Sequence, residues 1–356
     1  MSIIRVVFLS NWQLHNPYQK LLAEQLISQG CQVEIYYCDL IFLPFFMKFW
    51  QPTILHIHTL HPFLVSKHKF YQPLKTFVFL IQILILKILQ IKIVWTVHEW
   101  NDKMAGGKYS LNQTHIFIID KFLDALITHS NFTKLELAKS FENLVNKNKL
   151  FVVSHANYID YYPNQINQQE ARKNLGIPAK TFVFLLFGNI YPYKGFIQAI
   201  EAFQALPPDN IYLLIAGKPV DQNIAILIEN KIKNSENISF SPKFIANDQV
   251  QLYFNASDCA IMPYQVFTTS GIALLAMSFG RVCIAPKIGH FSEILDQYGA
   301  FLYDPNANDG LLQSMKFAID NQYHILDMGK HNFTIAQQWN WHLMAQQTLK
   351  IYTENL

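Results

Sequence analysis

Short apolar runs alternate with helical segments along the whole chain, a pattern typical of parallel sheets joined by crossover helices. Six runs in the first half predict one sheet, namely residues 3–9, 32–37, 54–58, 91–97, 125–128 and 150–153. Six later runs predict a second sheet, namely residues 181–187, 212–216, 238–241, 259–262, 282–285 and 300–303. The pattern therefore predicts an α/β protein with two parallel sheets.

A polar break separates the two groups of strands. Between Asp160 and Gln169, a Tyr-Tyr-Pro-Asn sequence and a Gln/Asn-rich run interrupt the apolar pattern. We therefore expect a first domain over residues 1–163 and a second over residues 170–335. Residues 336–356 carry apolar side chains near helical spacing and predict a C-terminal helix.

Two apolar segments raise the question of membrane contact. Residues 77–94 are interrupted by two lysines and two glutamines, so they fall short of the roughly 18 uncharged residues that a membrane span needs. We interpret residues 74–89 as a buried helix that leads into the strand 91–97. Residues 40–50 fit either a segment that dips into a membrane interface or receives a lipid-linked acceptor, or a part of the core, and the sequence leaves both open.

Composition narrows the class of protein. The chain has 356 residues, of which 51% are hydrophobic and 15% charged, which allows two domains with large cores. The net charge of +3 is spread without a basic stripe, so nucleic acid is not an expected partner. The four cysteines stand singly, and residues 1–10 predict a buried strand rather than a signal peptide. We therefore expect a cytoplasmic protein with reduced thiols.

Two strand-to-helix segments carry candidate chemistry. The first is residues 188–195 (GNIYPYKG), which follow an apolar strand. The second is residues 270–285 (SGIALLAMSFGRVCIA), in which a hydroxyl-glycine step opens a helix of small residues. Glycines and hydroxyls at a helix start leave backbone N–H groups pointing at an anion. Two such segments in one parallel-sheet domain predict a diphosphate held between two loops.

Both segments resemble the second domain of GT4-like retaining glycosyltransferases of the GT-B fold. In that family the first segment reads Gly-Arg-Leu-x-x-x-Lys-Gly, and the second ends in Glu-Ala-Met-Ala-x-Gly-x-Pro-Val-Ile-Ala. Further matches follow in the family's order, at residues 16–18 (NPY), 94–99 (VWTVHE), 124–130, 155–158 (HANY), 289–293 (GHFSE) and 341–352. The resemblance implies two Rossmann-like, doubly wound parallel-sheet domains that face a central cleft, with residues 336–356 crossing back to the first domain.

Lys194 is the residue that the first segment singles out. A lysine between a Tyr-Pro-Tyr turn and a glycine can bring a point charge to a diphosphate and stabilise it as it leaves. The alternative is a solvated loop lysine. The family has an arginine where this chain has Asn189, so one of two expected cations is absent, because an amide donates hydrogen bonds but carries no charge. Gly188 and Asn189 are assigned with Lys194 to donor binding.

The second segment departs from the family pattern as well. The paired glutamates of the family fall at Phe267 and Leu275, which are apolar here. A subset of similar enzymes keeps a Thr-Ser-Gly step, whose hydroxyl and N–H groups can bind phosphate oxygens; the alternative is that Thr269 or Ser270 only caps the helix. Glu293 fits either a contact to ribose or sugar hydroxyls or a surface position at a helix start. The residues assigned to donor binding here are Tyr264, Thr268, Thr269, Ser270, Gly271 and Glu293.

Candidate residues of the first domain follow its strands. His98 and Glu99 come directly after a strand, where an imidazole and a carboxylate can orient a hydroxyl and assist its proton loss. In similar enzymes the histidine contacts the transferred sugar, so with Lys194 we assign this pair as catalytic; a structural pair is the alternative. The candidate acceptor-side residues are Asn16, Tyr18, His155 and Asn157.

A metal site is not expected. His56 and His58 share one face of a strand and His61 follows, but no carboxylate or thiol stands at a matching spacing. The chain has no Asp-x-Asp, which the other large glycosyltransferase fold uses for its divalent ion. We therefore expect metal-independent chemistry without a cofactor, with a nucleotide sugar as co-substrate.

The resemblance implies a retaining hexosyltransferase that uses a nucleotide sugar and a hydroxyl acceptor on a lipid-linked or polysaccharide glycan at the cytoplasmic face of the membrane, with peripheral membrane contact. The alternative is a catalytically weak donor-binding subunit or scaffold that kept the fold but lost the arginine and both glutamates. A sugar-nucleotide epimerase is disfavoured because the sequence shows no pair of acid/base carboxylates.

Overall fold

The computed structural model describes residues 3–10, 17–38, 40–43, 52–66, 68–98 and 111–354. The predicted site residues Asn16 and Glu99 lie outside this range, as do residues 44–50 of the apolar segment that begins at Leu40. The chain divides into two compact units. One comprises Met1–His155 with Asn340–Leu356, and the other comprises Ala156–Trp339.

In the described part of the first unit, six parallel strands form one sheet in the order β2-β1-β3-β4-β5-β6. The strands are β1 Arg5–Ser10, β2 Gln32–Tyr37, β3 Ile54–Ile57, β4 Lys92–Thr96, β5 Ala125–Thr128 and β6 Leu150–Val152. The helices are α1 Pro17–Ser28, α3 His61–Leu64, η1 Lys69–Tyr71, α4 Gln72–Ile88, α5 Gln113–Phe122, α6 Asn131–Ala138, α7 Glu142–Asn146 and α16 Trp341–Glu354.

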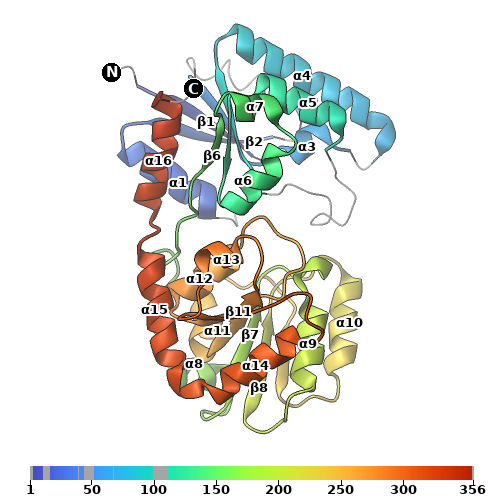
Figure 1. The fold of residues 1–356 in the computed structure, drawn as a ribbon, viewed down its shortest axis with the longest axis vertical. Helices are drawn as coiled ribbons and strands as arrows, with labels where there is room; N and C mark the ends of the chain where they lie inside the picture. The colour runs from blue at the N-terminus through green and yellow to red at the C-terminus, as the bar shows by residue number, and fades with distance from the viewer. Residues whose placement is uncertain are drawn as a thin grey trace. The chain divides into compact units, whose positions relative to one another are not determined.

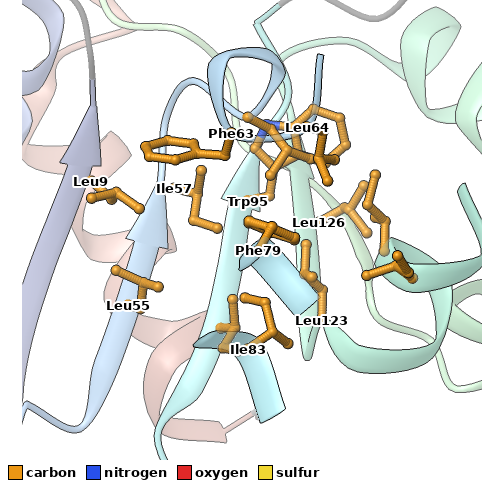
Figure 2. Packing of buried hydrophobic residues seen from close by; sticks show 14 of the residues in the cluster. Leu9, Leu55, Ile57, Phe63, Leu64, Phe79, Ile83, Trp95, Leu123 and Leu126 are labelled. Carbon is orange, nitrogen blue, oxygen red and sulfur yellow. The ribbon is translucent and has the colours of Figure 1, made fainter. Parts of the chain in front are cut away.

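The core of this unit lies between the sheet and the helices on one of its faces (Figure 2). The strands contribute Leu9, Leu55, Ile57, Trp95 and Leu126, and the helical and connecting segments contribute Phe63, Leu64, Phe79, Ile83 and Leu123. β3, β4 and β5 are buried almost throughout, so they read as continuous apolar runs, which is why the sequence pattern located them. The edge strand β2 is exposed or half-buried at every residue. Figure 1 shows α16 beside α1, which it contacts.

In the second unit, six parallel strands form a sheet in the order β12-β11-β10-β7-β8-β9. The strands are β7 Phe182–Phe187, β8 Ile211–Ala216, β9 Ile238–Ser241, β10 Cys259–Ile261, β11 Val282–Pro286 and β12 Ala300–Tyr303. The helices are α8 Gln168–Asn174, η3 Pro192–Lys194, α9 Phe196–Gln204, α10 Gln222–Ile232, α11 Val250–Ala256, α12 Gly271–Ser278, α13 Phe291–Ile294, α14 Gly310–Asp320, η4 Gln322–His324 and α15 Ile325–Gln337. This strand order is that of a doubly wound Rossmann sheet. The predicted α/β fold with two parallel sheets is confirmed.

The helix predicted at residues 74–89 forms as α4, but the expectation that it is buried was wrong for one of its faces. Phe79, Ile83 and Leu86 pack into the core, whereas Leu74 and Phe77 are exposed. The sequence of α4 is apolar on both faces, so periodicity could not tell which face the sheet covers. Among the helices of the described ranges, none is long and apolar enough to cross a membrane.

Candidate active-site residues

The two predicted anion-binding segments follow neighbouring strands of the second sheet. β7 and β10 pair at the centre of that sheet, where the chain order of the strands reverses. In open α/β sheets, ligands bind beyond the carboxyl ends of the strands at this point. Residues 188–195 come directly after β7, and the residues after β10 lead to α12. The topology therefore brings the two segments to the same end of the sheet.

Close backbone contacts hold the loop after β7 in place. Gly195 has φ +69°, and a Cβ there would lie 2.2 Å from the carbonyl oxygen of Pro263, so only glycine fits. The backbone N–H of Gln265 donates to the carbonyl of Tyr193 over 2.9 Å. This hydrogen bond and the close approach of Gly195 to Pro263 join the loop after β7 to the loop after β10. The two loops therefore form one structural site.

Lys194 points back toward the start of this loop. Gly188 has φ +99°, and a Cβ at that position would lie 3.9 Å from the Nζ atom of Lys194. The ammonium lies 5.9 Å from the ring centroid of Tyr191 and 5.4 Å from that of Tyr264. Asn189, the neighbour of Gly188, is exposed.

The charge of Lys194 has no acidic partner in the part of the chain that the structure describes, although its side chain is half-buried. Burial lowers its pKa to about 8, because the ammonium loses water without gaining a carboxylate. A half-buried cation that lies over two aromatic rings without a carboxylate partner in the described ranges is a site that an anion would stabilise.

The N-terminus of α12 lies beside Gly188. The Cδ1 atom of Ile272 would be 3.0 Å from a Cβ on Gly188. Ser270 caps the helix, and its Oγ accepts from the N–H of Ala273 over 3.2 Å. Within the described ranges, no hydrogen bond is made by the N–H groups of Gly271 and Ile272. Two free N–H groups at a helix start can bind phosphate oxygens.

The positions of the family's paired glutamates are parts of the core here. The ring of Phe267 packs on that of Phe291, with centroids 4.2 Å apart, and Leu275 is 3% exposed. Thr268 is buried and Thr269 is half-exposed. Neither apolar position can supply a hydrogen bond to a donor sugar or ribose.

Two residues that the sequence did not assign to donor binding lie at the start of α12. The buried His290 accepts from the N–H of Ser270 at Nδ1 over 3.4 Å, which ties the loop after β11 to the cap of α12. The hydroxyl of Tyr158 would lie 3.5 Å from a Cβ on Gly271. Both residues fall within the segments that resemble the family, which was the available signal. Glu293, three residues after His290, is exposed on α13.

In the first unit, imidazoles gather at the carboxyl ends of four neighbouring strands. Tyr18, at the start of α1, lies at their centre, with its ring centroid 4.6 Å from that of His98 and 5.1 Å from that of His155. The other rings within 5.7 Å of Tyr18 are those of His58, His129 and Trp341. We call His56, His58, His98, His129 and His155 the histidine cluster. Three residues assigned from sequence, Tyr18, His98 and His155, therefore come together.

Burial keeps four imidazoles of the histidine cluster neutral, those of His56, His58, His98 and His129. Loss of water lowers the pKa of His56 to about 3 and that of His129 to about 4, and it holds the pKa values of His58 and His98 well below the usual range. The Nδ1 atom of His58 lies 3.5 Å from Nε2 of His98. The buried Nε2 atoms of His58 and His129 have no hydrogen-bond partner among the described residues.

No group of three His, Cys, Asp or Glu residues in the described ranges could hold a metal ion. His56 instead bonds the hydroxyls of Thr96 and Tyr352. Asn157, assigned from sequence to the acceptor side, uses its amide within the second unit, where Nδ2 donates to the carbonyl of Ala336 over 2.7 Å.

Known proteins resemble this chain in sequence over its second unit and in fold over nearly its whole length. Residues 167–333 match the family described as glycosyl transferases group 1. The chain is 25% identical over 166 residues to GDP-mannose:glycolipid 4-beta-D-mannosyltransferase of Xanthomonas campestris pv. campestris, which covers 46% of this chain and 45% of that protein. The chain spans about half the length of the curated relatives it matches.

Two solved structures share the fold over nearly the whole chain. Sucrose-phosphate synthase of Thermosynechococcus elongatus has a TM-score of 0.78 at 14% identity, and HepE of Anabaena, solved in complex with UDP and glucose, has a TM-score of 0.75 at 15% identity. Each comparison covers 98% of both chains. This chain therefore has the GT-B glycosyltransferase fold, and its residues 167–333 match the family of group 1 glycosyl transferases.

Proposed function

We propose that this protein is a retaining hexosyltransferase that moves a sugar from a nucleotide-sugar donor to a hydroxyl of a lipid-linked or polysaccharide glycan. The observation that carries the proposal is the unpaired ammonium of Lys194 beside the free N–H groups of α12. Together they offer a cation and a helix N-terminus to a diphosphate. A Xanthomonas relative is named for a GDP-mannose donor and a glycolipid acceptor, and HepE was solved with UDP.

Each group in the proposed donor site has a separate task. The N–H groups of Gly271 and Ile272 bind phosphate oxygens, with Thr268, Thr269 and Ser270 supplying hydroxyls. Lys194 stabilises the negative charge that develops on the diphosphate as the bond to the sugar breaks. Gly188 gives the phosphates close access to the backbone, and Asn189, Tyr264 and Glu293 contact the rest of the donor.

In the first unit, we propose that His98 contacts the transferred sugar and acts in catalysis with Glu99. A neutral imidazole can accept a proton from a hydroxyl, and burial keeps His98 neutral. Tyr18 and His155, which lie in the same cluster, are proposed to bind the acceptor, together with Asn16 and Asn157.

We propose that the reaction needs no metal, because protein groups take the place of a divalent ion at the diphosphate. Transfer is expected to continue in excess EDTA. Complete loss of transfer that manganese or magnesium restores would contradict this. We further propose a cytoplasmic location at the inner face of the plasma membrane, to which the four free cysteines are suited.

One observation favours a second candidate function, a donor-binding subunit with weak activity. Phe267 and Leu275 occupy the glutamate positions, and Asn189 replaces an arginine. A panel of UDP-, GDP- and ADP-sugars, screened by thermal shift and then by turnover, separates the two candidates. Binding of one donor without measurable release of its nucleotide would favour the subunit. The anomeric configuration of the product, read by NMR, tests retention.

A further inference from the structure

The outer face of α4 and the η1 turn before it form an apolar stripe in the first unit. We call this surface the α4 stripe; its residues are Phe70, Tyr71, Leu74, Phe77, Ile81, Leu84, Ile85, Ile88 and Leu89, all exposed. Phe70 is 87%, Phe77 60% and Ile88 79% exposed. Their spacing follows the turns of one helix, so these side chains share a face. A continuous stripe of this length is unusual for a surface that faces only water.

The rest of the unit holds this stripe in a fixed position. The opposite face of α4 buries Phe79, Ile83 and Leu86 in the core. The Nζ atom of Lys75 donates to the carbonyls of Pro62 and Val65, and Lys87 forms an ion pair with Asp124 over 2.7 Å. α4 is therefore presented as a rigid element that can lie on an apolar phase but cannot leave the core to cross it.

Charge around the stripe indicates what covers it. Residues 40–98 contain six lysines and no aspartate or glutamate. The carboxylate of Asp124, which contacts α4, is paired with Lys87. On the adjacent α5, the exposed Phe117 lies under the ammonium of Lys121, 5.3 Å from its ring centroid. A segment that carries lysines and no carboxylates favours an anionic partner and disfavours a second copy of itself.

A second apolar segment begins beside α4. The buried side chain of Gln82 accepts from the N–H of Phe42 over 2.7 Å and donates to the carbonyl of Leu40 over 3.0 Å. Residues 40–43 are thereby fixed to α4, with Ile41 exposed. The apolar sequence of residues 40–50, for which a membrane interface was one of two interpretations, therefore starts on this helix.

We propose that the α4 stripe docks the first unit on an anionic lipid bilayer, with α4 in the plane of the interface. The aromatic and aliphatic side chains enter the boundary between headgroups and acyl chains, and the excess of lysine over carboxylate in residues 40–98 attracts anionic headgroups. The proposal depends on no step of the sugar transfer, and it places membrane contact on α4, which the sequence pattern had assigned to the core.

Vesicle flotation with the full chain tests this proposal. Vesicles of phosphatidylcholine alone are compared with vesicles that also contain phosphatidylglycerol. The stripe variant carries Phe70→Ser, Phe77→Ser and Ile88→Ser. The matched control carries Leu135→Ser, Phe317→Ser and Leu326→Ser, whose native side chains are 67%, 58% and 70% exposed. Both variants should melt near the wild-type temperature, because exposed side chains contribute little to stability.

Wild-type and control proteins should float with the anionic vesicles, and roughly tenfold less with neutral vesicles or at high salt. The stripe variant should lose binding by roughly tenfold or more while it binds nucleotide as the wild type does in calorimetry. Retained flotation of the stripe variant, or absent flotation of the wild type, overturns the proposal. So does a wild-type dimer that the stripe variant converts to a monomer without any vesicle binding. Because donor binding is read separately, failure of this proposal is distinguishable from failure of the proposed transfer.

Discussion

Lys194 carries a positive charge at a position where an anion would stabilise it. Its ammonium is half-buried between the rings of Tyr191 and Tyr264, and burial lowers its pKa to about 8. The aromatic faces stabilise the cation weakly, less than a carboxylate would. A diphosphate bound at this position would supply the negative charge that Lys194 lacks in the free protein. Binding of the diphosphate and protonation of Lys194 are therefore linked.

Replacing Lys194 by alanine should remove most transfer activity while the fold is kept. The lost interaction with the departing diphosphate should raise the barrier by about 2 to 4 kcal/mol. Steady-state kinetics with the preferred donor measure this, and Lys243→Ala, which removes an exposed lysine of the same unit, serves as the control. Near-normal turnover of Lys194→Ala would exclude the assigned role.

Donor affinity should fall as the pH rises above about 8, the pKa of Lys194 in the free protein. The bound diphosphate favours the charged lysine, so above this pH binding must take up a proton and weakens by up to about tenfold per pH unit. Calorimetry from pH 7 to 9.5 measures the slope. The Lys194→Arg variant should lose the slope, because a guanidinium stays charged throughout. A flat wild-type profile would contradict the linkage.

The sequence located Lys194 and the step at residues 268–271, because local motifs follow strands that are easy to recognise. It could not supply the contacts across the fold. Tyr264 lies over the lysine, and His290 bonds Ser270, through packing between loops that are distant in sequence. For the same reason, the sequence assigned His98 and His155 singly but did not predict that the histidine cluster comes together. Its members follow four different strands, and their convergence on Tyr18 depends on strand order, which periodicity does not encode.

At the scale of elements, the strands were predicted within a residue or two, since parallel strands covered on both faces are apolar throughout. β7 was expected at residues 181–187 and spans Phe182–Phe187. Helix burial was harder to predict. α12 and α4 both have apolar sequences, yet α12 is buried along most of its length and α4 is exposed on one face. The amount of apolar sequence does not reveal which neighbours cover a helix.

The start of α12 gives a test of the proposed phosphate site. A Cβ on Gly271 would make an ordinary contact with the Tyr158 hydroxyl at 3.5 Å, so Gly271→Ala should fold. The larger Gly271→Val should weaken nucleotide binding, because its methyl groups crowd the N–H groups that are assigned to the phosphates. Calorimetry with the preferred nucleotide measures both variants. Unchanged affinity in Gly271→Val would place the phosphates elsewhere.

The neighbouring position Leu275 tests whether a family glutamate could be restored. Leu275 is buried, so Leu275→Glu should lower the melting temperature, because a carboxylate without a partner is costly in the core. Donor affinity of the folded fraction should not rise. A clear gain in affinity would show that the position faces the donor after all, and would favour the weakly active donor-binding subunit as the function of the present sequence.

At the scale of the whole molecule, the two units differ in the polar groups that they place at the carboxyl ends of their parallel strands. The second unit has a cation without an acidic partner, and helix N–H groups without an acceptor, among the residues that the structure describes. The first unit buries imidazoles together, with two Nε2 atoms lacking hydrogen bonds in the described ranges. Unsatisfied polar atoms cost stability, so both arrangements are consistent with sites in which a ligand completes the bonding.

The stability of the first unit should fall as the pH drops below about 6.5, the usual pKa of histidine. In the folded protein, His56, His58, His98 and His129 have lowered pKa values and stay neutral, whereas in the unfolded chain they take up protons. Acid therefore favours unfolding, by about 1.4 kcal/mol per pH unit for each such proton, until the folded-state pKa is reached. The rings that face these imidazoles are those of Phe8, Tyr18, Trp341 and Tyr352, which are uncharged in this range, and those of the other histidines.

Urea unfolding between pH 7.5 and 4.5 measures how steeply the free energy of unfolding depends on pH. His129→Gln should reduce the slope by about one proton, while His68→Gln, at an exposed position of the same unit, should not. Equal slopes in wild type and His129→Gln would mean that His129 has the same protonation state in the folded and the unfolded protein.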